Sequence, residues 1–176
     1  MTDIGAQLRQ ESPEVYYAPP GLAIGDAEIS WLIECASRLP RLRARICLHR
    51  DPQSPVHDML IVHHRTGYVR PHRHFNREML IAPLQGTATT FTFQENGAVD
   101  RQIAMGPAGS GRVVLYCMPR DLFYSLIIES EWLVFLETTA GPFDPKSSEF
   151  AAWSPDDKDE AAVGAFMRQL RQAIPG

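Results

Sequence analysis

Histidine is the residue type whose placement in this sequence points most directly to chemistry. All six histidines lie in one part of the chain, between His49 and His74. His72 and His74 are two positions apart in a segment with strand character, so both imidazoles leave the same face and can converge on one point. Because neutral imidazole is the commonest metal ligand among side chains, this pair indicates a metal site.

A carboxylate is expected to join the two imidazoles. Glu78 follows His74 by four residues, which in a straight strand would separate them by about 13 Å. A reversal at Asn76 and Arg77 would bring Glu78 back, because asparagine tolerates turn conformations. Two imidazoles and one carboxylate form the facial triad used for Fe(II), and they also suit Mn, Zn or Ni. The sequence therefore predicts one divalent metal ion held by His72, His74 and Glu78.

The residue order around this pair resembles the first motif of the cupins, with Gly67, His72-Arg-His74, Glu78 and Gly86 in sequence. More narrowly, four segments are similar to the WbuC family of cupin-fold metalloproteins: Arg70-Pro-His-Arg-His, Pro55-Val-His-Asp-Met-Leu-Ile-Val, Ala140-Gly-Pro-Phe-Asp-Pro and Glu149-Phe-Ala-Ala-Trp153-Ser-Pro. The resemblance covers about residues 45–155. It implies a double-stranded β-helix (jelly-roll) barrel and a fourth metal ligand, a histidine from a second motif.

The second cupin motif departs from the family pattern. Where Pro-x-Gly-x-x-His is expected, the chain has Pro119-Arg-Asp-Leu-Phe-Tyr124. A phenol with a pKa near 10 is a poor ligand, although a bound metal can lower that pKa and accept the phenolate. Three arrangements stay open: Tyr124 as the fourth ligand, Tyr124 acting as an acid or base through a metal-bound water, or a weakened or empty site.

Two neighbours of the pair are predicted to contact a substrate. Tyr68 and Arg70 share parity with His72, so they are expected to face the same cavity unless Pro71 disturbs the alternation. The forked guanidinium of Arg70 would suit a carboxylate or phosphate, or else form a structural ion pair.

An arginine-rich stretch offers a second candidate for anion binding. Five arginines and no acidic residue occur from Arg38 to Arg50, and Arg41, Arg43 and Arg45 alternate with apolar residues. Alternation of this kind is typical of a half-buried strand with a basic solvent face. The same residues could instead form an anion-binding rim.

The predicted elements describe a mainly β fold with a helix at each end. A helix is expected at 27–38 after an Asp26 cap, and another at 155–173 after Ser154-Pro155. Short runs with strand composition lie at 58–64, 67–74, 78–84, 87–94, 98–105, 112–118, 122–129 and 132–139. The predicted organisation is an N-terminal arm and helix (1–45), a cupin barrel (46–140) and a C-terminal arm and helix (141–176).

Composition excludes several classes of protein. A chain of 176 residues with 44% hydrophobic residues suits one globular domain, and a net charge of −4 offers no general attraction to nucleic acid. Three cysteines, an odd number, argue against a disulfide framework. The sequence contains neither an apolar run long enough to span a membrane nor a recognisable signal peptide, so a cytoplasmic protein is predicted. The resemblance to cupins, which commonly pair, implies a homodimer.

The functional prediction is a metal-dependent enzyme acting on a small polar molecule, with isomerisation, epimerisation and oxygenation all open. The family resemblance implies a sugar or nucleotide-sugar from surface-polysaccharide metabolism. The alternative is a non-catalytic binding or sensing cupin with a degraded metal site. A third possibility is a structural, partner-binding protein.

Overall fold

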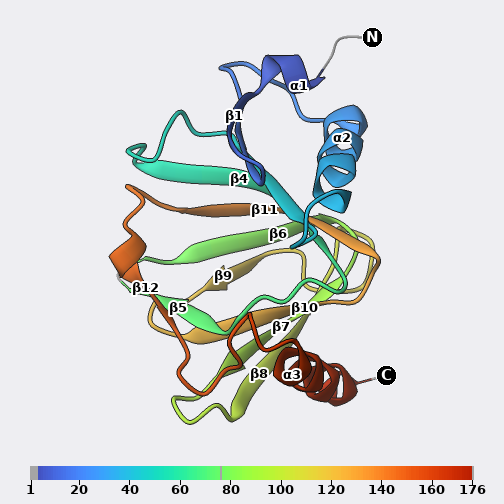
Figure 1. Cartoon of the computed structure of the whole chain (residues 1–176), viewed down its shortest axis with the longest axis vertical. Helices are drawn as coiled ribbons and strands as arrows, with labels where there is room; N and C mark the ends of the chain where they lie inside the picture. The colour runs from blue at the N-terminus through green and yellow to red at the C-terminus, as the bar shows by residue number, and fades with distance from the viewer. Residues whose placement is uncertain (1–3, 76, 176) are drawn as a thin grey trace.

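The computed structural model describes residues 4–75 and 77–175. Two facing β-sheets form the body of the molecule (Figure 1). One sheet has the order β1 (Arg9–Ser12), β2 (Val15–Tyr17), β3 (Arg43–Cys47), β4 (Val56–His64), β11 (Trp132–Ala140), β6 (Met79–Gln85) and β9 (Tyr116–Met118). The other has the order β12 (Ser148–Phe150), β5 (His72–His74), β10 (Phe123–Ile128), β7 (Ala88–Phe93) and β8 (Val99–Met105).

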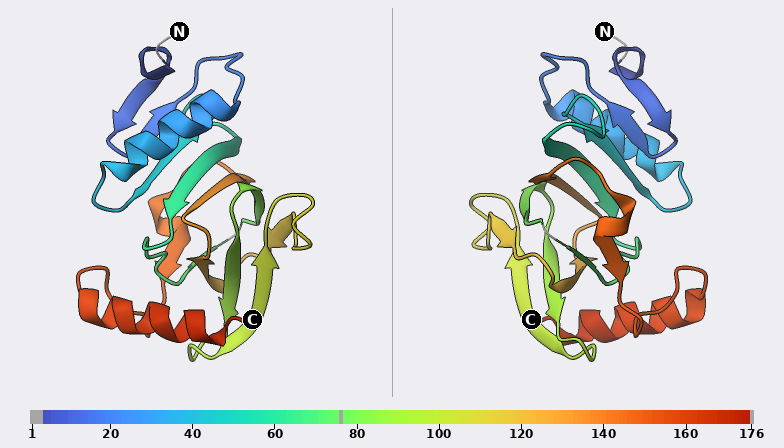
Figure 2. Two further views of the ribbon diagram at one scale, coloured as in Figure 1. Left: turned by 90° about the vertical axis from the view of Figure 1, so that its right-hand side faces the viewer. Right: turned by 90° about the vertical axis from the view of Figure 1, so that its left-hand side faces the viewer.

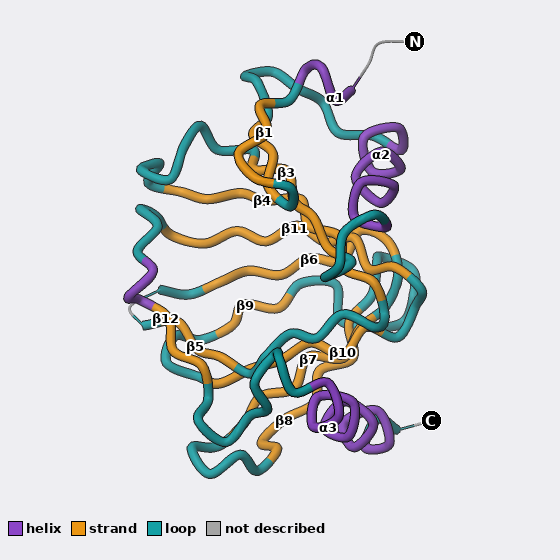
Figure 3. The backbone as a smooth tube through the Cα atoms, viewed as in Figure 1, coloured by secondary structure: helices purple, strands orange, loops and turns teal. Residues whose placement is uncertain are grey.

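The strand predictions between residues 58 and 139 are confirmed as β4 to β11. Neighbouring strands in both sheets are antiparallel, apart from the parallel pair β2 and β3. The predicted strand at 67–74 is shorter, because residues 67–71 form an irregular segment that leads into β5 (Figure 3). The predicted reversal at Asn76 lies outside the described residues. The mainly β fold class, with a helix near each end, is confirmed.

Both predicted helices are present with shifted starts. Helix α2 (Asp26–Ser37) follows a Gly25 cap, and the Gly25 N–H donates to the Glu28 carboxylate at 2.8 Å. Helix α3 (Glu160–Ala173) starts five residues later than expected, because the Asp159 carboxylate accepts the Ala162 N–H at 3.0 Å and so caps the helix. A short helix α1 (Ile4–Gln7) and a 3₁₀ turn (Pro145–Ser147) complete the elements.

The two helices cover opposite outer faces of the sandwich (Figure 2). Leu32 and Ala36 of α2 are fully buried against Ile46 and Val62 of the seven-stranded sheet. Leu170 of α3 packs in a separate apolar cluster with aromatic residues of β7 and β10. The space between the sheets is therefore closed from outside on both faces, and the inward-facing residues form a third apolar cluster.

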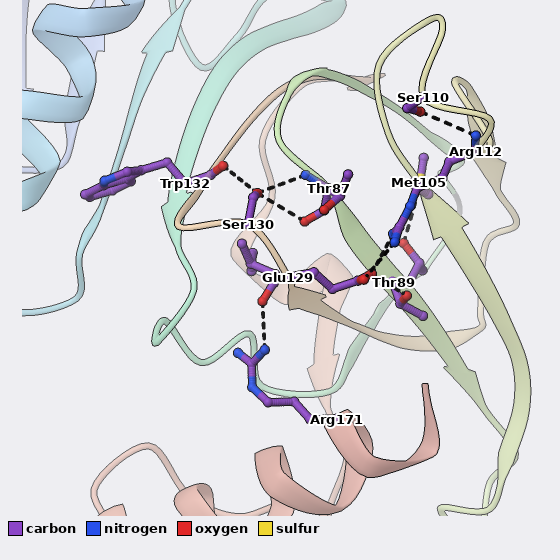
Figure 4. A network of polar contacts seen from close by, with 11 residues as sticks. Thr87, Thr89, Met105, Ser110, Arg112, Glu129, Ser130, Trp132 and Arg171 are labelled. Atoms are coloured by element: carbon purple, nitrogen blue, oxygen red, sulfur yellow. Dashed lines mark hydrogen bonds and ion pairs between the residues drawn. The ribbon is translucent and has the colours of Figure 1, made fainter. Parts of the chain in front are cut away.

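A polar network ties α3 to the barrel (Figure 4). The Arg171 guanidinium donates to the Ile128 carbonyl at 2.9 Å, at the end of β10. Next to it, the Glu129 carboxylate accepts two hydrogen bonds from Arg112, at 2.8 and 2.9 Å, and one from Thr89 at 2.8 Å. No helix within the described ranges has the length and apolar character needed to cross a bilayer.

Candidate functional site

A cavity of about 460 Å³ lies between the two sheets. This volume is in the range of small-molecule sites. Many of the side chains in its wall are ionisable. The imidazoles are those of His49, His57, His63, His72 and His74. The guanidiniums are those of Arg43, Arg45 and Arg77, and the carboxylates are those of Glu11, Glu14 and Glu137.

Strand alternation explains which side chains reach the cavity. The odd-numbered residues of β3, β4 and β11 face inward, among them Arg45, His63 and Glu137. On the opposite sheet, Tyr124 of β10 is paired in register with His72 of β5. The two sheets thus present charged groups on one side and the His72, His74 and Tyr124 cluster on the other.

The imidazoles of His72 and His74 converge on one oxygen atom. The Tyr124 hydroxyl lies 2.7 Å from His72 Nε2 and 3.2 Å from His74 Nε2. Tyr124 is 4% exposed, so this oxygen is almost removed from solvent. The expected convergence of the two histidines is present, and the point on which they converge is occupied by the phenol.

Hydrogen bonds at the far ring nitrogens assign the tautomer of each imidazole. His72 Nδ1 lies 2.8 Å from the Arg70 carbonyl, which can only accept, so this nitrogen carries the proton. His74 Nδ1 lies 3.0 Å from Nη2 of Arg77, which can only donate, so here the proton is on Nε2. The Ser148 hydroxyl, 2.7 Å from His74 Nδ1, can donate to the same lone pair.

With these tautomers, all the hydrogen bonds of the cluster run in the same donor-to-acceptor direction, from Arg77 to the Arg70 carbonyl. Arg77 donates to His74, His74 Nε2–H donates to the Tyr124 oxygen, and the Tyr124 hydroxyl donates to His72 Nε2. His72 then donates to the Arg70 carbonyl. Each ring nitrogen and the phenol oxygen have a hydrogen-bond partner. The series of hydrogen bonds therefore avoids the free-energy cost of leaving these buried polar atoms unpaired.

The surroundings of His72, His74 and Tyr124 keep each of them in the protonation state that this series of hydrogen bonds requires. Burial lowers the pKa of His72, and burial, His72 and Arg77 lower the pKa of His74 to about 3. Burial, followed by the nearby Glu137, raises the pKa of Tyr124 well above its usual value. Both imidazoles are therefore neutral and the phenol is protonated at neutral pH.

Glu78 does not join the two histidines, which corrects the predicted triad. Its side chain is exposed and lines a separate depression with Arg120 and Thr138. The reason is the register of β6, because Met79 pairs with Thr139 and its buried side chain faces the interior. Alternation then sends Glu78 outward, and the Met79 sulfur lies 3.8 Å from the Tyr124 hydroxyl.

The side chains present at this point fit a divalent metal poorly. Within residues 4–75 and 77–175, no group of three histidine, cysteine or acidic side chains is arranged to hold a metal ion. A histidine bound to metal through Nε2 normally donates its other N–H to an acceptor. His72 meets that condition, but His74 Nδ1 faces a guanidinium donor. A cation bound there would also lie near the charge of Arg77.

The predicted substrate contacts Tyr68 and Arg70 do not line the cavity, which is a second correction. The Tyr68 hydroxyl donates to the Pro155 carbonyl at 3.1 Å. Arg70 donates hydrogen bonds to the Ser154 hydroxyl at 3.2 Å and to the Asp156 carboxylate at 2.8 Å. It therefore forms a structural ion pair, which was the alternative role for this residue. Val69 faces the cavity instead, because the irregular segment before Pro71 breaks the alternation that would align Arg70 with His72.

The arginine-rich stretch fits both interpretations that its sequence left open. Arg43 and Arg45 lie on strand β3, whose other face packs Ala44 and Ile46 beneath α2. The basic face of this strand lines the cavity. Arg43 is paired with Glu14 at 3.1 Å.

Sequence reasoning missed two residues of the cavity wall. Arg77 was assigned only to a turn, and Glu137 was not considered. A signal for Glu137 existed, because it shares strand parity with the apolar residues Leu133 and Phe135 and so had to face the interior. Burial raises the pKa of Glu137 to about 7, even though Arg45 and Arg77 act to lower it.

The comparisons with solved structures support the fold. A model of a domain of unknown function (DUF6016) matches residues 24–105. Among solved structures, protein SO0799 from Shewanella oneidensis has a TM-score of 0.51 at 12% identity, over 74% of this chain and 82% of that one. A search of curated proteins found no match.

The capsular polysaccharide assembling protein CapF from Staphylococcus aureus is similar with a TM-score of 0.50 at 13% identity. The match covers 63% of this chain and 32% of that chain, so this chain spans about a third of the length of CapF. At these identities the likeness concerns the fold. The chain has the cupin fold, a double-stranded β-helix of two mainly antiparallel sheets.

Proposed function

We propose that this chain is a small-molecule-binding cupin whose cavity takes a compact polar ligand without a metal ion. The observation that carries the proposal is the hydrogen-bonded chain through His74, Tyr124 and His72. It places a phenol where the two imidazoles meet and uses the lone pairs that a metal would need. The cavity beside it keeps a volume suited to a metabolite.

A metabolite linked to surface polysaccharides, either a sugar or a nucleotide-sugar, is our proposal for the ligand class. It rests on the resemblance to the WbuC family described above. The similarity to CapF, a capsular polysaccharide assembling protein, is one of fold, and at 13% identity it adds no argument on the ligand.

A metal-dependent enzyme is the second candidate. It is favoured by the approach of two Nε2 atoms to one point, 2.7 and 3.2 Å from the same oxygen. It is opposed by the outward position of Glu78 and by the donor that Arg77 presents to His74. On this candidate the ion would be Fe, Mn, Zn or Ni, and Tyr124 would supply a fourth ligand.

Native mass spectrometry of the full chain with a panel of neutral and acidic monosaccharides separates the two candidates. Binding that is equal with and without EDTA is the expected result. Binding that disappears with EDTA and returns with one added metal would favour the enzyme. If no panel member binds under either condition, the small-molecule proposal fails.

A further inference from the structure

The charges around the cavity do not balance. Of its three carboxylates, Glu14 is already paired with Arg43 at 3.1 Å and Glu11 with Arg9 at 2.6 Å. Arg45 and Arg77 have no acidic partner within the described part of the chain. Glu137 is the remaining carboxyl group, and it also lacks a hydrogen-bond or ion-pair partner there.

Arg77 has unused hydrogen-bond donors. Its Nη2 donates to His74 Nδ1 at 3.0 Å and approaches the Ser148 hydroxyl at 3.4 Å. Its Nε is buried and has no acceptor, and its Nη1 has none among the residues described. A guanidinium carries five donors, so Arg77, which lines the cavity, keeps N–H groups at Nη1 that can donate to a ligand carboxylate.

Glu137 decides how much positive charge is left. Two unpaired guanidiniums and one ionised carboxylate leave a single positive charge, and protonation of Glu137 would leave two. Burial favours the protonated form of Glu137, whereas Arg45 and Arg77 favour the ionised form. In both cases the cavity keeps a net positive charge, from Arg77 in its wall and from Arg45, whose side chain is also exposed to solvent, and this charge favours an anionic ligand.

We propose that the ligand of this cavity is a small carboxylate, a sugar acid or hydroxy acid, whose carboxylate is bound by Arg77 together with Arg45. This inference rests on the proposed function and narrows its ligand class. A carboxylate matches the excess of one to two charges and the fork of Arg77. The protonated Glu137 adds a donor to a ligand oxygen, and Leu126 and Phe135 provide apolar contact for the carbon skeleton.

The test compares D-glucuronate with D-glucuronamide, which has nearly the same shape and no charge. Isothermal titration calorimetry is done on the full chain in EDTA, for the wild type, Arg77→Gln and Arg101→Gln. Arg101 is exposed on β8 and does not line the cavity, so its variant removes the same charge elsewhere. Circular dichroism and thermal unfolding confirm that each variant is folded.

The expected result is glucuronate binding at least tenfold tighter than glucuronamide, a loss of tenfold or more in Arg77→Gln, and an unchanged affinity in Arg101→Gln. Equal binding of the two sugars would overturn the carboxylate inference and leave the proposed function standing. Equal weakening in both variants would reduce the effect to general electrostatics and would also overturn it. If neither sugar binds, the inference fails, and the neutral members of the monosaccharide panel then decide the proposed function.

Discussion

The Nη2 atom of Arg77 lies 3.0 Å from Nδ1 of His74, and this contact fixes which nitrogen of the imidazole carries its proton. A guanidinium can only donate, so His74 keeps its proton on Nε2, toward Tyr124. In a metal-binding histidine the arrangement is reversed, with a bare Nε2 toward the metal and a donating Nδ1. Arg77 is therefore one of three features, with the outward Glu78 and the Tyr124 phenol, that distinguish this cavity from a metal centre.

Metal affinity should rise when this arrangement is removed. In the double variant Arg77→Gln/Tyr124→His, a third imidazole replaces the phenol and no guanidinium opposes the change of tautomer at His74. We expect Zn²⁺ or Ni²⁺ to bind at least tenfold more tightly than in the wild type, as measured by competition with a chromophoric chelator. Glu78→Gln is the control and should not change metal affinity. Stoichiometric metal in the wild type that is lost in Glu78→Gln would restore the predicted triad.

Loss of the Tyr124 hydroxyl should destabilise the fold. Tyr124→Phe leaves His72 Nε2 and His74 Nε2–H without their partner in a buried site, at a cost of about 1–3 kcal/mol. Urea unfolding measures the change. Tyr116→Phe is the matched control, because within the described residues the Tyr116 hydroxyl makes no hydrogen bond, and we expect less than about 0.5 kcal/mol. Similar losses in both variants would argue against the hydrogen-bonded chain.

Acid should unfold the protein through its buried histidines. Burial, with help from neighbouring arginines, lowers the pKa of His63 to about 3, and the pKa of His74 is also about 3. Below pH 6.5 the unfolded chain binds protons at these positions and the folded chain does not. The free energy of unfolding therefore decreases as the pH is lowered from 6.5 to about 3. Unfolding curves at pH 7.5, 6 and 5 measure the trend.

His63→Gln should reduce this acid sensitivity, because one of the histidines that bind protons more readily in the unfolded state is lost. His64→Gln is the control, since His64 lies on the opposite face of β4 and contacts Thr66. If both variants keep the full dependence on pH, the buried neutral state of His63 is contradicted.

Ligand affinity should depend on pH through Glu137. Its pKa of about 7 reflects burial opposed by Arg45 and Arg77, and Tyr124 is the other titratable group that interacts with it. Above pH 7 the ionised Glu137 repels a carboxylate, so glucuronate should bind more weakly at pH 8 than at pH 6, by several-fold. Calorimetry at the two pH values measures the change, and Glu137→Gln should abolish it. Tighter binding at pH 8 would contradict the role given to Glu137.

Strand patterns in the sequence were sufficient to predict the barrel. Alternating runs such as Leu133 to Thr139 and turn residues such as Gly86 carry local information that survives in the folded chain. Gly86 has a φ of +78°, and a Cβ atom there would lie 2.2 Å from the Trp132 carbonyl oxygen, so only glycine fits that turn. The strand order in each sheet is not a local property and was not predicted, and the type of barrel was implied by the family resemblance.

The site was harder to predict, because its composition depends on register. His72 and His74 were identified correctly as convergent, since two residues on one strand keep their relation. Glu78 directly precedes the next strand, β6, and a shift of one residue there places Met79 and not Glu78 toward the interior. The irregular segment before Pro71 has the same effect, because it places Val69 and not Arg70 in the cavity wall.

The most direct test of the central claim, that His72 and His74 hold the Tyr124 phenol and not a metal, is the tautomer of each imidazole. Long-range ¹H–¹⁵N NMR of the histidine side chains distinguishes protonation at Nδ1 from protonation at Nε2. We predict the proton on Nδ1 in His72 and on Nε2 in His74, unchanged when one equivalent of Zn²⁺ is added. A bare Nε2 in both residues, or a shift of both on addition of Zn²⁺, would contradict the account.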